Sequence, residues 1–131
     1  MHKEVITYID YDGVEQTEEF LFNLNKAELM EMNFSASGGM EKMLKRIVEA
    51  KDTKRIVEVF KDIILKAYGE KSDDGKRFIK YRDGHNLADD FAQSEAYSEL
   101  FMKLATDEDA AIAFINGIIP KQLADELAAK G

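Results

Sequence analysis

The acidic residues near the N-terminus have a spacing that could bind calcium. Counted from Tyr8, the residues Asp10, Asp12, Gly13 and Glu19 occupy positions three, five, six and twelve of an EF-hand loop. The first position normally supplies an aspartate ligand, and here it is a tyrosine. The flanking residues also alternate with period two, whereas an EF-hand loop lies between two helices. We therefore interpret this segment as a β-turn that carries acidic side chains.

Other residue types that support catalysis do not form a recognisable set. The chain has no cysteine, and its only histidines, His2 and His85, have too few candidate partners for a zinc or haem site. After Gly38-Gly39 the sequence lacks the Lys-Ser/Thr pair of a phosphate-binding loop, and no Gly-x-Ser-x-Gly motif is present. We predict that the protein is not an enzyme and needs no metal or cofactor.

The length and the net charge indicate what kind of protein this is. The 131 residues are near the commonest length for one domain, and the net charge is -8. Residues 51–80 contain 9 basic and 6 acidic side chains, and the acidic ones are interleaved with the basic ones along the segment. A nucleic-acid-binding protein normally has a concentrated basic face. We therefore expect a small acidic protein that does not bind nucleic acid.

The apolar segments are too short for a membrane protein. Runs such as Phe20-Leu21-Phe22 contrast with the roughly 20 apolar residues of a membrane-spanning helix. The N-terminal residues lack the apolar stretch of a signal peptide. The absence of cysteine fits a reducing compartment. We expect no membrane association and a cytoplasmic location.

The pattern of apolar residues predicts one domain, residues 1–131, of mostly α class with a short N-terminal β-hairpin (α+β). The hairpin is expected in residues 1–24, with strands at Glu4–Ile9 and Glu15–Phe22 and a turn at Asp10–Gly13. Residues 25–131 are expected to form a compact multi-helix part. No repeat or linker is visible, so a second domain is not expected.

The first predicted helices have clear boundaries. Asn25 and Glu28 form a capping-box pattern at the start of a short helix, and Leu24 and Leu29 match a hydrophobic staple. A second helix is predicted over residues 40–50. The strongest pattern, Thr53–Tyr68, has a broad apolar stripe and predicts the central core helix. The following residue, Gly69, is expected to end this helix as a left-handed C′ residue.

The remaining pattern predicts further helices. Residues 70–77 are expected to form a polar turn, and Phe78–Tyr81 to be extended or a short helical lead-in. One helix is predicted from Asn86 or Leu87 to about Leu104. Another is expected after a capping box formed by Thr106 and Asp109, and a last one is expected to begin at Pro120.

Two regions contain apolar residues that are candidates for a partner-binding face. Methionine is enriched at surfaces that adapt to partners. An ordinary core is the alternative interpretation of the same side chains, because a helical apolar stripe usually faces a core. The candidate residues are Met30, Met32, Phe34, Met40, Met43, Phe114, Ile118 and Ile119.

Segments distributed over nearly the whole chain together resemble one protein family. These segments are Glu4–Tyr8, Phe20–Leu24, Asn25–Leu29, Ile64–Ser72, Ser94–Leu100 and Phe114–Pro120. In them the sequence resembles tail assembly chaperones of long-tailed (siphovirus-type) phages or prophages of Gram-positive bacteria. The resemblance implies a largely helical, non-enzymatic protein that binds the tape measure protein, the tail tube protein or both during tail assembly, and is absent from the virion. It also implies that a longer, frameshifted form can exist.

Two other functions remain open from the sequence. One is a structural tail or head-completion subunit that stays in the virion. The other is a small acidic regulator or inhibitor that occupies a basic groove of a host protein. Neither the partner, the binding face nor the oligomeric state follows from the residues alone.

Overall fold

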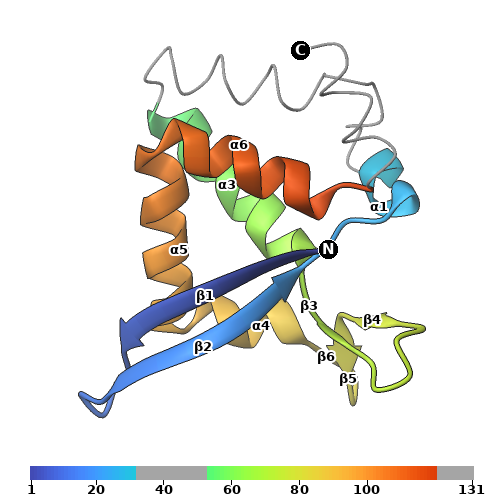
Figure 1. Cartoon of the computed structure of the whole chain (residues 1–131), viewed down its shortest axis with the longest axis horizontal. Helices are drawn as coiled ribbons and strands as arrows, with labels where there is room; N and C mark the ends of the chain where they lie inside the picture. The colour runs from blue at the N-terminus through green and yellow to red at the C-terminus, as the bar shows by residue number, and fades with distance from the viewer. Residues whose placement is uncertain (32–52, 121–131) are drawn as a thin grey trace.

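The computed structural model describes residues 1–31 and 53–120 (Figure 1). In this part of the chain, helices pack on one face of an antiparallel sheet with the strand order β1-β2-β3-β4, and β5 and β6 form a separate small hairpin. The elements in chain order are β1 (His2–Ile9), β2 (Glu15–Phe22), α1 (Lys26–Glu31), α3 (Thr53–Ala67), β3 (Tyr68–Lys71), β4 (Phe78–Ile79), β5 (Tyr81–Arg82), β6 (His85–Asn86), α4 (Leu87–Ala92), α5 (Glu95–Thr106) and α6 (Glu108–Ile118).

The N-terminal hairpin is confirmed, and its turn uses the residues that resembled a calcium loop. The Asp10 carboxylate accepts hydrogen bonds from the backbone N–H groups of Asp12 and Val14, both at 2.9 Å. Gly13 has a φ of 79°, which a glycine adopts without steric cost. Glu19 lies in β2, where it pairs with Lys3 at 3.6 Å. The acidic side chains therefore belong to a β-turn and a strand, as the sequence indicated.

The sheet is larger than predicted, because the chain enters a strand directly after α3. Gly69 was expected to end the helix in a left-handed conformation, but it lies in β3, opposite Leu21 of β2. A Cβ atom on Gly69 would lie 2.6 Å from Phe78 Cε2 and 2.8 Å from the Ile79 carbonyl oxygen. Glycine is needed there because β4 crosses closely. The fold is thus α+β, and the part predicted as helical also contains β3–β6.

The predicted helix ends are partly confirmed. At α1 the capping box is present: the Asn25 N–H donates to Glu28 Oε1 at 3.0 Å, and the Glu28 N–H donates to Asn25 Oδ1 at 2.8 Å. The helix predicted from Leu87 to Leu104 is instead two helices. The Ser94 hydroxyl donates to the Phe91 carbonyl oxygen at 2.7 Å, and its oxygen accepts from the Tyr97 N–H at 3.4 Å as the N-cap of α5, so α5 is separate from α4.

The start of α6 lies one residue later than expected. Asp107 caps this helix by accepting a hydrogen bond from the Ala110 N–H at 3.1 Å. Thr106 remains the last residue of α5, because its hydroxyl donates to the Met102 carbonyl oxygen at 2.6 Å. The helices predicted for residues 40–50 and after Pro120 lie outside the described residues.

The core lies between the inner face of the sheet and the helices, with α3 at its centre as predicted. Ile63 and Ile64 of α3 are fully buried. Aromatic rings connect the layers: Tyr68 of β3 stacks on Phe91 of α4 with centroids 4.5 Å apart, and Phe22 of β2 meets Phe114 of α6 at 5.2 Å. Aromatic pairs of this kind stabilise a core beyond their buried area.

Candidate functional site

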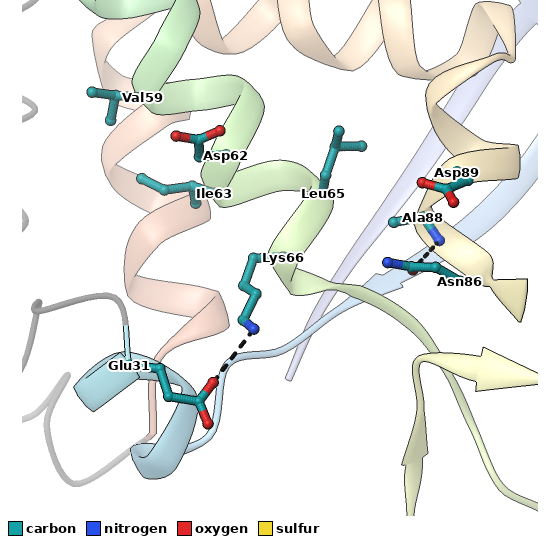
Figure 2. A pocket seen from close by; sticks show the side chains of 9 residues that line it. All are labelled: Glu31, Val59, Asp62, Ile63, Leu65, Lys66, Asn86, Ala88 and Asp89. Carbon is teal, nitrogen blue, oxygen red and sulfur yellow. Dashed lines mark hydrogen bonds and ion pairs between the residues drawn. The ribbon is translucent and has the colours of Figure 1, made fainter. Parts of the chain in front are cut away.

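A groove of about 530 Å³ lies between α1, α3 and α4 (Figure 2). We call it the helix groove. The side chains of α3 form its centre, α1 contributes one residue at one end, and the first residues of α4 with the preceding cap residue contribute the other side. Its lining residues are Glu31, Val59, Asp62, Ile63, Leu65, Lys66, Asn86, Ala88 and Asp89.

The floor of the helix groove is apolar. Ile63 of α3 and Ala88 of α4 are buried, whereas Val59 and Leu65 of α3 are half-buried and pack against the core. These two side chains therefore keep part of their apolar surface in contact with solvent. Covering such surface stabilises a complex by roughly 25 cal/mol per Å² before the costs of association are subtracted.

The rim of the helix groove is acidic. Asp62 and Asp89 are exposed, and Glu31 of α1 lies 3.5 Å from the ammonium group of Lys66, as Figure 2 shows. Three carboxylates thus line the groove together with one lysine, which is paired with Glu31. A rim with this charge favours basic side chains at the edge of a bound partner and accelerates their approach.

Lys80 holds α1 and α3 in the arrangement that forms the groove. Its ammonium group lies 2.8 Å from Glu28 Oε2 of α1 and donates to the Asn23 carbonyl oxygen at 2.9 Å and to the Lys66 carbonyl oxygen at the end of α3. A cation is favourable there, because the C-terminal end of a helix carries partial negative charge. Burial lowers the pKa of Lys80, while the hydrogen bond and charge of Glu28 act in the opposite direction.

A tight hairpin positions the α4 side of the groove. Asp83 and Gly84 connect β5 to β6 with φ values of 53° and 76°, as a two-residue type I′ turn requires. The next residue after the hairpin, Leu87, donates its N–H to the Lys80 carbonyl oxygen at 2.9 Å. Asn86 then caps α4 by accepting from the Ala88 N–H at 3.0 Å.

The two histidines have specific partners outside the groove. His2 Nε2 lies 2.8 Å from Glu4 Oε1 in β1, and His85 Nε2 lies 2.9 Å from Asp90 Oδ1. The Asp90 carboxylate raises the pKa of the exposed His85. In residues 1–31 and 53–120, no group of three or more His, Cys, Asp or Glu side chains could hold a metal ion. In the same residues, no helix has the length and apolar character that crossing a membrane would require.

The described part of the chain contains four of the predicted binding-face residues, Met30, Phe114, Ile118 and Ile119. Phe114, Ile118 and Ile119 are buried, because α6 packs this face on the core, so they do not form an exposed face here. Met30 is 70% exposed on α1, one residue before the groove residue Glu31. The other candidates, Met32, Phe34, Met40 and Met43, lie outside the described residues.

Sequence reasoning missed the helix groove because Val59 and Ile63 of its floor belong to the stripe of α3 that indicated a core. Val59 lies at one margin of that stripe, whereas Leu65, six residues later, lies about 120° away around the helix and outside the stripe. Both side chains are half-buried and pack against the core. The position of α4 decides how much of them is covered. The nearest signal in the sequence is that acidic residues, Asp62 and Asp89, flank the apolar positions of both helices.

A comparison with known protein families gave a match over nearly the whole chain. A family model described as phage tail assembly chaperone matches residues 1–130. No curated protein and no solved structure matched the chain.

Proposed function

The chain belongs to the phage tail assembly chaperone family, and from this premise we propose that it binds the tape measure protein, the tail tube protein or both through the helix groove. The binding needs no catalytic step. The proposed place of action is the cytoplasm of the host bacterium, before the tail is complete. The chaperone then leaves the assembled particle.

The observation that supports this proposal is the combination of a half-buried apolar floor with an acidic rim. An amphipathic helix fits such a groove when its apolar stripe faces Val59 and Leu65 and its basic residues lie against Asp62 and Asp89. Exposed apolar surfaces of an unassembled subunit promote aggregation, and binding of the chaperone covers the apolar stripe and prevents it. Reversible binding in this groove suits a chaperone, because the partner must be released into the tail.

The test uses matched substitutions on the two sides of α3. Val59→Glu places a charge on the groove floor, whereas Val57→Glu places the same charge on a side chain outside the groove that is 42% exposed. Each variant is co-expressed with the tail tube protein or the tape measure protein and analysed by size-exclusion chromatography. We expect the wild type and Val57→Glu to co-elute with a partner, and Val59→Glu not to do so.

Several results would contradict the proposal. Thermal unfolding must first show that Val59→Glu is folded, since Val59 also packs against the core. Equal co-elution of the two variants would exclude the groove as the binding site. Failure of both tail proteins to bind the wild type would contradict the proposed partners.

Salt and particle composition separate this function from the two alternatives. Apolar contacts persist at high salt, whereas Asp62→Lys should slow association mainly at low salt, relative to the control Asp73→Lys on the exposed β3–β4 turn. A complex that dissociates completely at moderate salt would favour an acidic regulator. Stoichiometric amounts of the protein in purified particles would favour a structural subunit.

A further inference from the structure

Three turns of this chain contain an aspartate followed by a glycine. Asp12-Gly13 lies between β1 and β2, Asp74-Gly75 between β3 and β4, and Asp83-Gly84 between β5 and β6. The glycines have φ values of 79°, 74° and 76°, and both residues of each pair are exposed to solvent. By sequence and exposure the three pairs are therefore equivalent.

An Asp-Gly pair can rearrange without an enzyme. The glycine nitrogen attacks Cγ of the aspartate, a C–N bond forms, and the Cγ–OH bond breaks with loss of water, which leaves a succinimide ring. Water then adds to one of the two ring carbonyl carbons and breaks its bond to nitrogen. Opening at the side-chain carbonyl restores aspartate, whereas opening at the main-chain carbonyl yields isoaspartate. The reaction thus needs a free carboxyl group and a glycine N–H that can lose its proton.

Both reacting groups of Asp74-Gly75 are engaged within their own turn. Asp74 Oδ1 accepts hydrogen bonds from the Lys76 N–H at 3.0 Å and the Ser72 hydroxyl at 2.7 Å. These two bonds hold the pKa of Asp74 below its usual value, whereas the ring closes from the protonated carboxyl group. The Gly75 N–H donates to the Ser72 carbonyl oxygen at 2.9 Å. This turn therefore protects its aspartate.

At Asp12-Gly13 one of the two reacting groups is engaged. The Gly13 N–H donates to the Asp10 carbonyl oxygen at 3.0 Å. A hydrogen-bonded amide proton is lost only when the bond opens, so the glycine nitrogen reacts slowly. The Asp12 carboxylate has no hydrogen-bond or ion-pair partner among the described residues. We expect this pair to have intermediate reactivity.

At Asp83-Gly84 both reacting groups are free. Within residues 1–31 and 53–120, no hydrogen bond or ion pair engages the Asp83 carboxylate or the Gly84 N–H. The ladder bonds of a two-residue turn belong to the flanking pair, here Arg82 and His85, so the Gly84 N–H faces solvent. Asp83 also has a φ of 53°, a conformation that is strained for a residue with a Cβ atom. Leaving it for the ring therefore meets less resistance.

We propose that Asp83 is a modification site, at which the folded protein isomerises spontaneously to isoaspartate ahead of Asp12 and Asp74. Identical dipeptides acquire different reactivity from the hydrogen bonds of their turns. This inference concerns the chemistry of the chain itself. It does not depend on whether the helix groove binds tail proteins.

Isoaspartate at position 83 changes the hairpin that precedes α4. The rearrangement adds one carbon atom to the backbone of a turn whose geometry requires two ordinary residues. Two residue pairs hold β5 to β6, and the Leu87 N–H then donates to the Lys80 carbonyl oxygen at 2.9 Å. We expect these bonds to open more often after isomerisation. Asn86 lines the helix groove, so weaker partner binding by aged protein is a consequence that rests on the proposed function.

The test ages the whole folded protein in heavy-oxygen water at neutral pH. Each ring opening incorporates one heavy oxygen, so mass spectrometry of peptides, after digestion in ordinary water, measures the reaction at each pair. Isoaspartate is identified separately by methylation with an isoaspartyl methyltransferase. We expect Asp83 to react at least about tenfold faster than Asp74, because hydrogen bonds to a charged group must break there, and Asp12 to lie between them. The isomerised fraction should show faster hydrogen exchange at Leu87.

The unfolded chain is the control for intrinsic reactivity. In denaturant the turns are absent, and we expect the three pairs to react at similar rates. Asp83→Gly removes the carboxyl group and keeps a residue that suits a type I′ turn, so labelling of this peptide should disappear. Ser72→Ala removes one hydrogen bond from Asp74, and it should raise the rate at Asp74 several-fold while the rate at Asp83 stays unchanged.

Three outcomes would overturn the proposal. The first is equal labelling of the three pairs in the folded protein, since the turns would then not determine reactivity. The second is faster labelling at Asp12 or Asp74 than at Asp83. The third is the absence of isoaspartate at Asp83 in folded protein after all three pairs of the unfolded chain have reacted.

Discussion

The helix groove and the turn at Asp83-Gly84 differ in the contacts that determine their properties. The groove depends on side chains of packed helices, with an apolar floor on α3 and an acidic rim, whereas the turn depends on the backbone conformation of two residues. The groove shares its floor with the core through Ile63, which is fully buried, while both residues of the turn are exposed. Changes in the core should therefore disturb groove binding first and the isomerisation of Asp83 last.

Ile63→Ala is expected to have the largest effect. Removing this fully buried side chain should lower the free energy of unfolding by about 2–5 kcal/mol, because a cavity remains in the core. Groove binding should weaken in the same variant, because Ile63 also lines the groove. The control Lys61→Ala, on the exposed face of α3, should stay within about 0.5 kcal/mol. Equal effects in denaturant unfolding would show that the faces of α3 are wrongly assigned.

Lys80→Met is expected to have the next largest effect. The variant keeps most of the side-chain volume but removes the contacts to Glu28, Asn23 and Lys66 that join α1 to α3. We expect a loss of about 1–3 kcal/mol, since buried polar partners lose a charged donor. Groove binding should weaken while the rate of isomerisation in the β5–β6 turn stays unchanged. Lys76→Met, in the exposed β3–β4 turn, is the control for the loss of charge; an equal loss in both variants would contradict this role.

Gly117→Ala should disturb a part of the fold outside both regions. The added Cβ would lie 2.3 Å from His2 Nδ1 and 2.9 Å from His2 Cβ, so the first residue of β1 must move. We expect a net loss of about 1 kcal/mol, because the overlap outweighs the gain in helix propensity. Hydrogen exchange should become faster in β1 and remain unchanged in α3. Asn116→Ala, at the exposed neighbouring position, is the control, and faster exchange in both variants would contradict this explanation.

A pH effect at Glu4 should be the smallest. The hydrogen bond with His2, supported by the charge of Lys103, lowers the pKa of Glu4 from its usual 4.5. A carboxyl group with a lowered folded-state pKa stabilises the fold above its unfolded pKa, and this contribution is lost as the pH falls through the folded value. The difference in unfolding free energy between wild type and Glu4→Gln should therefore be present at pH 6 and decrease as the pH falls below the usual pKa of 4.5. A difference that persists at low pH would mean that packing, not charge, is responsible.

The sequence predicted the parts of the fold that depend on neighbours in the chain. The β-hairpin with its turn at Asp10–Gly13, the capping box of Asn25 and Glu28, and the core helix around Ile63 are all confirmed. Each depends on residues within a few positions of one another, where steric preference and capping act directly. The resemblance to tail assembly chaperones also led to the right family, while the Gram-positive, siphovirus-type context remains a prediction.

The errors lie where distant segments meet. Gly69 has the local signature of a helix end, and only the approach of Phe78 and Ile79 shows that it is needed in a strand. The predicted start of α6 at Thr106 and the predicted single helix from residue 87 to 104 were wrong because hydroxyl contacts of Thr106 and Ser94 with the preceding turn decide where one helix stops and the next begins. Phe114 and Ile118 are buried by packing, while the partner-binding role of the full predicted set stays a prediction.

The sequence by itself determined the hairpin, the charge, the centre of the core and the family, because local preferences and composition are properties of the chain. Only the tertiary structure decided which apolar side chains stay accessible. Val59 and Leu65 line a groove because Lys80 joins α1 to α3 and the β5–β6 hairpin positions α4 beside α3. Among the described strands, β3 pairs with β2 and none pairs with the outer edge of β1. Accessibility depends on the positions of whole elements, which no single segment specifies.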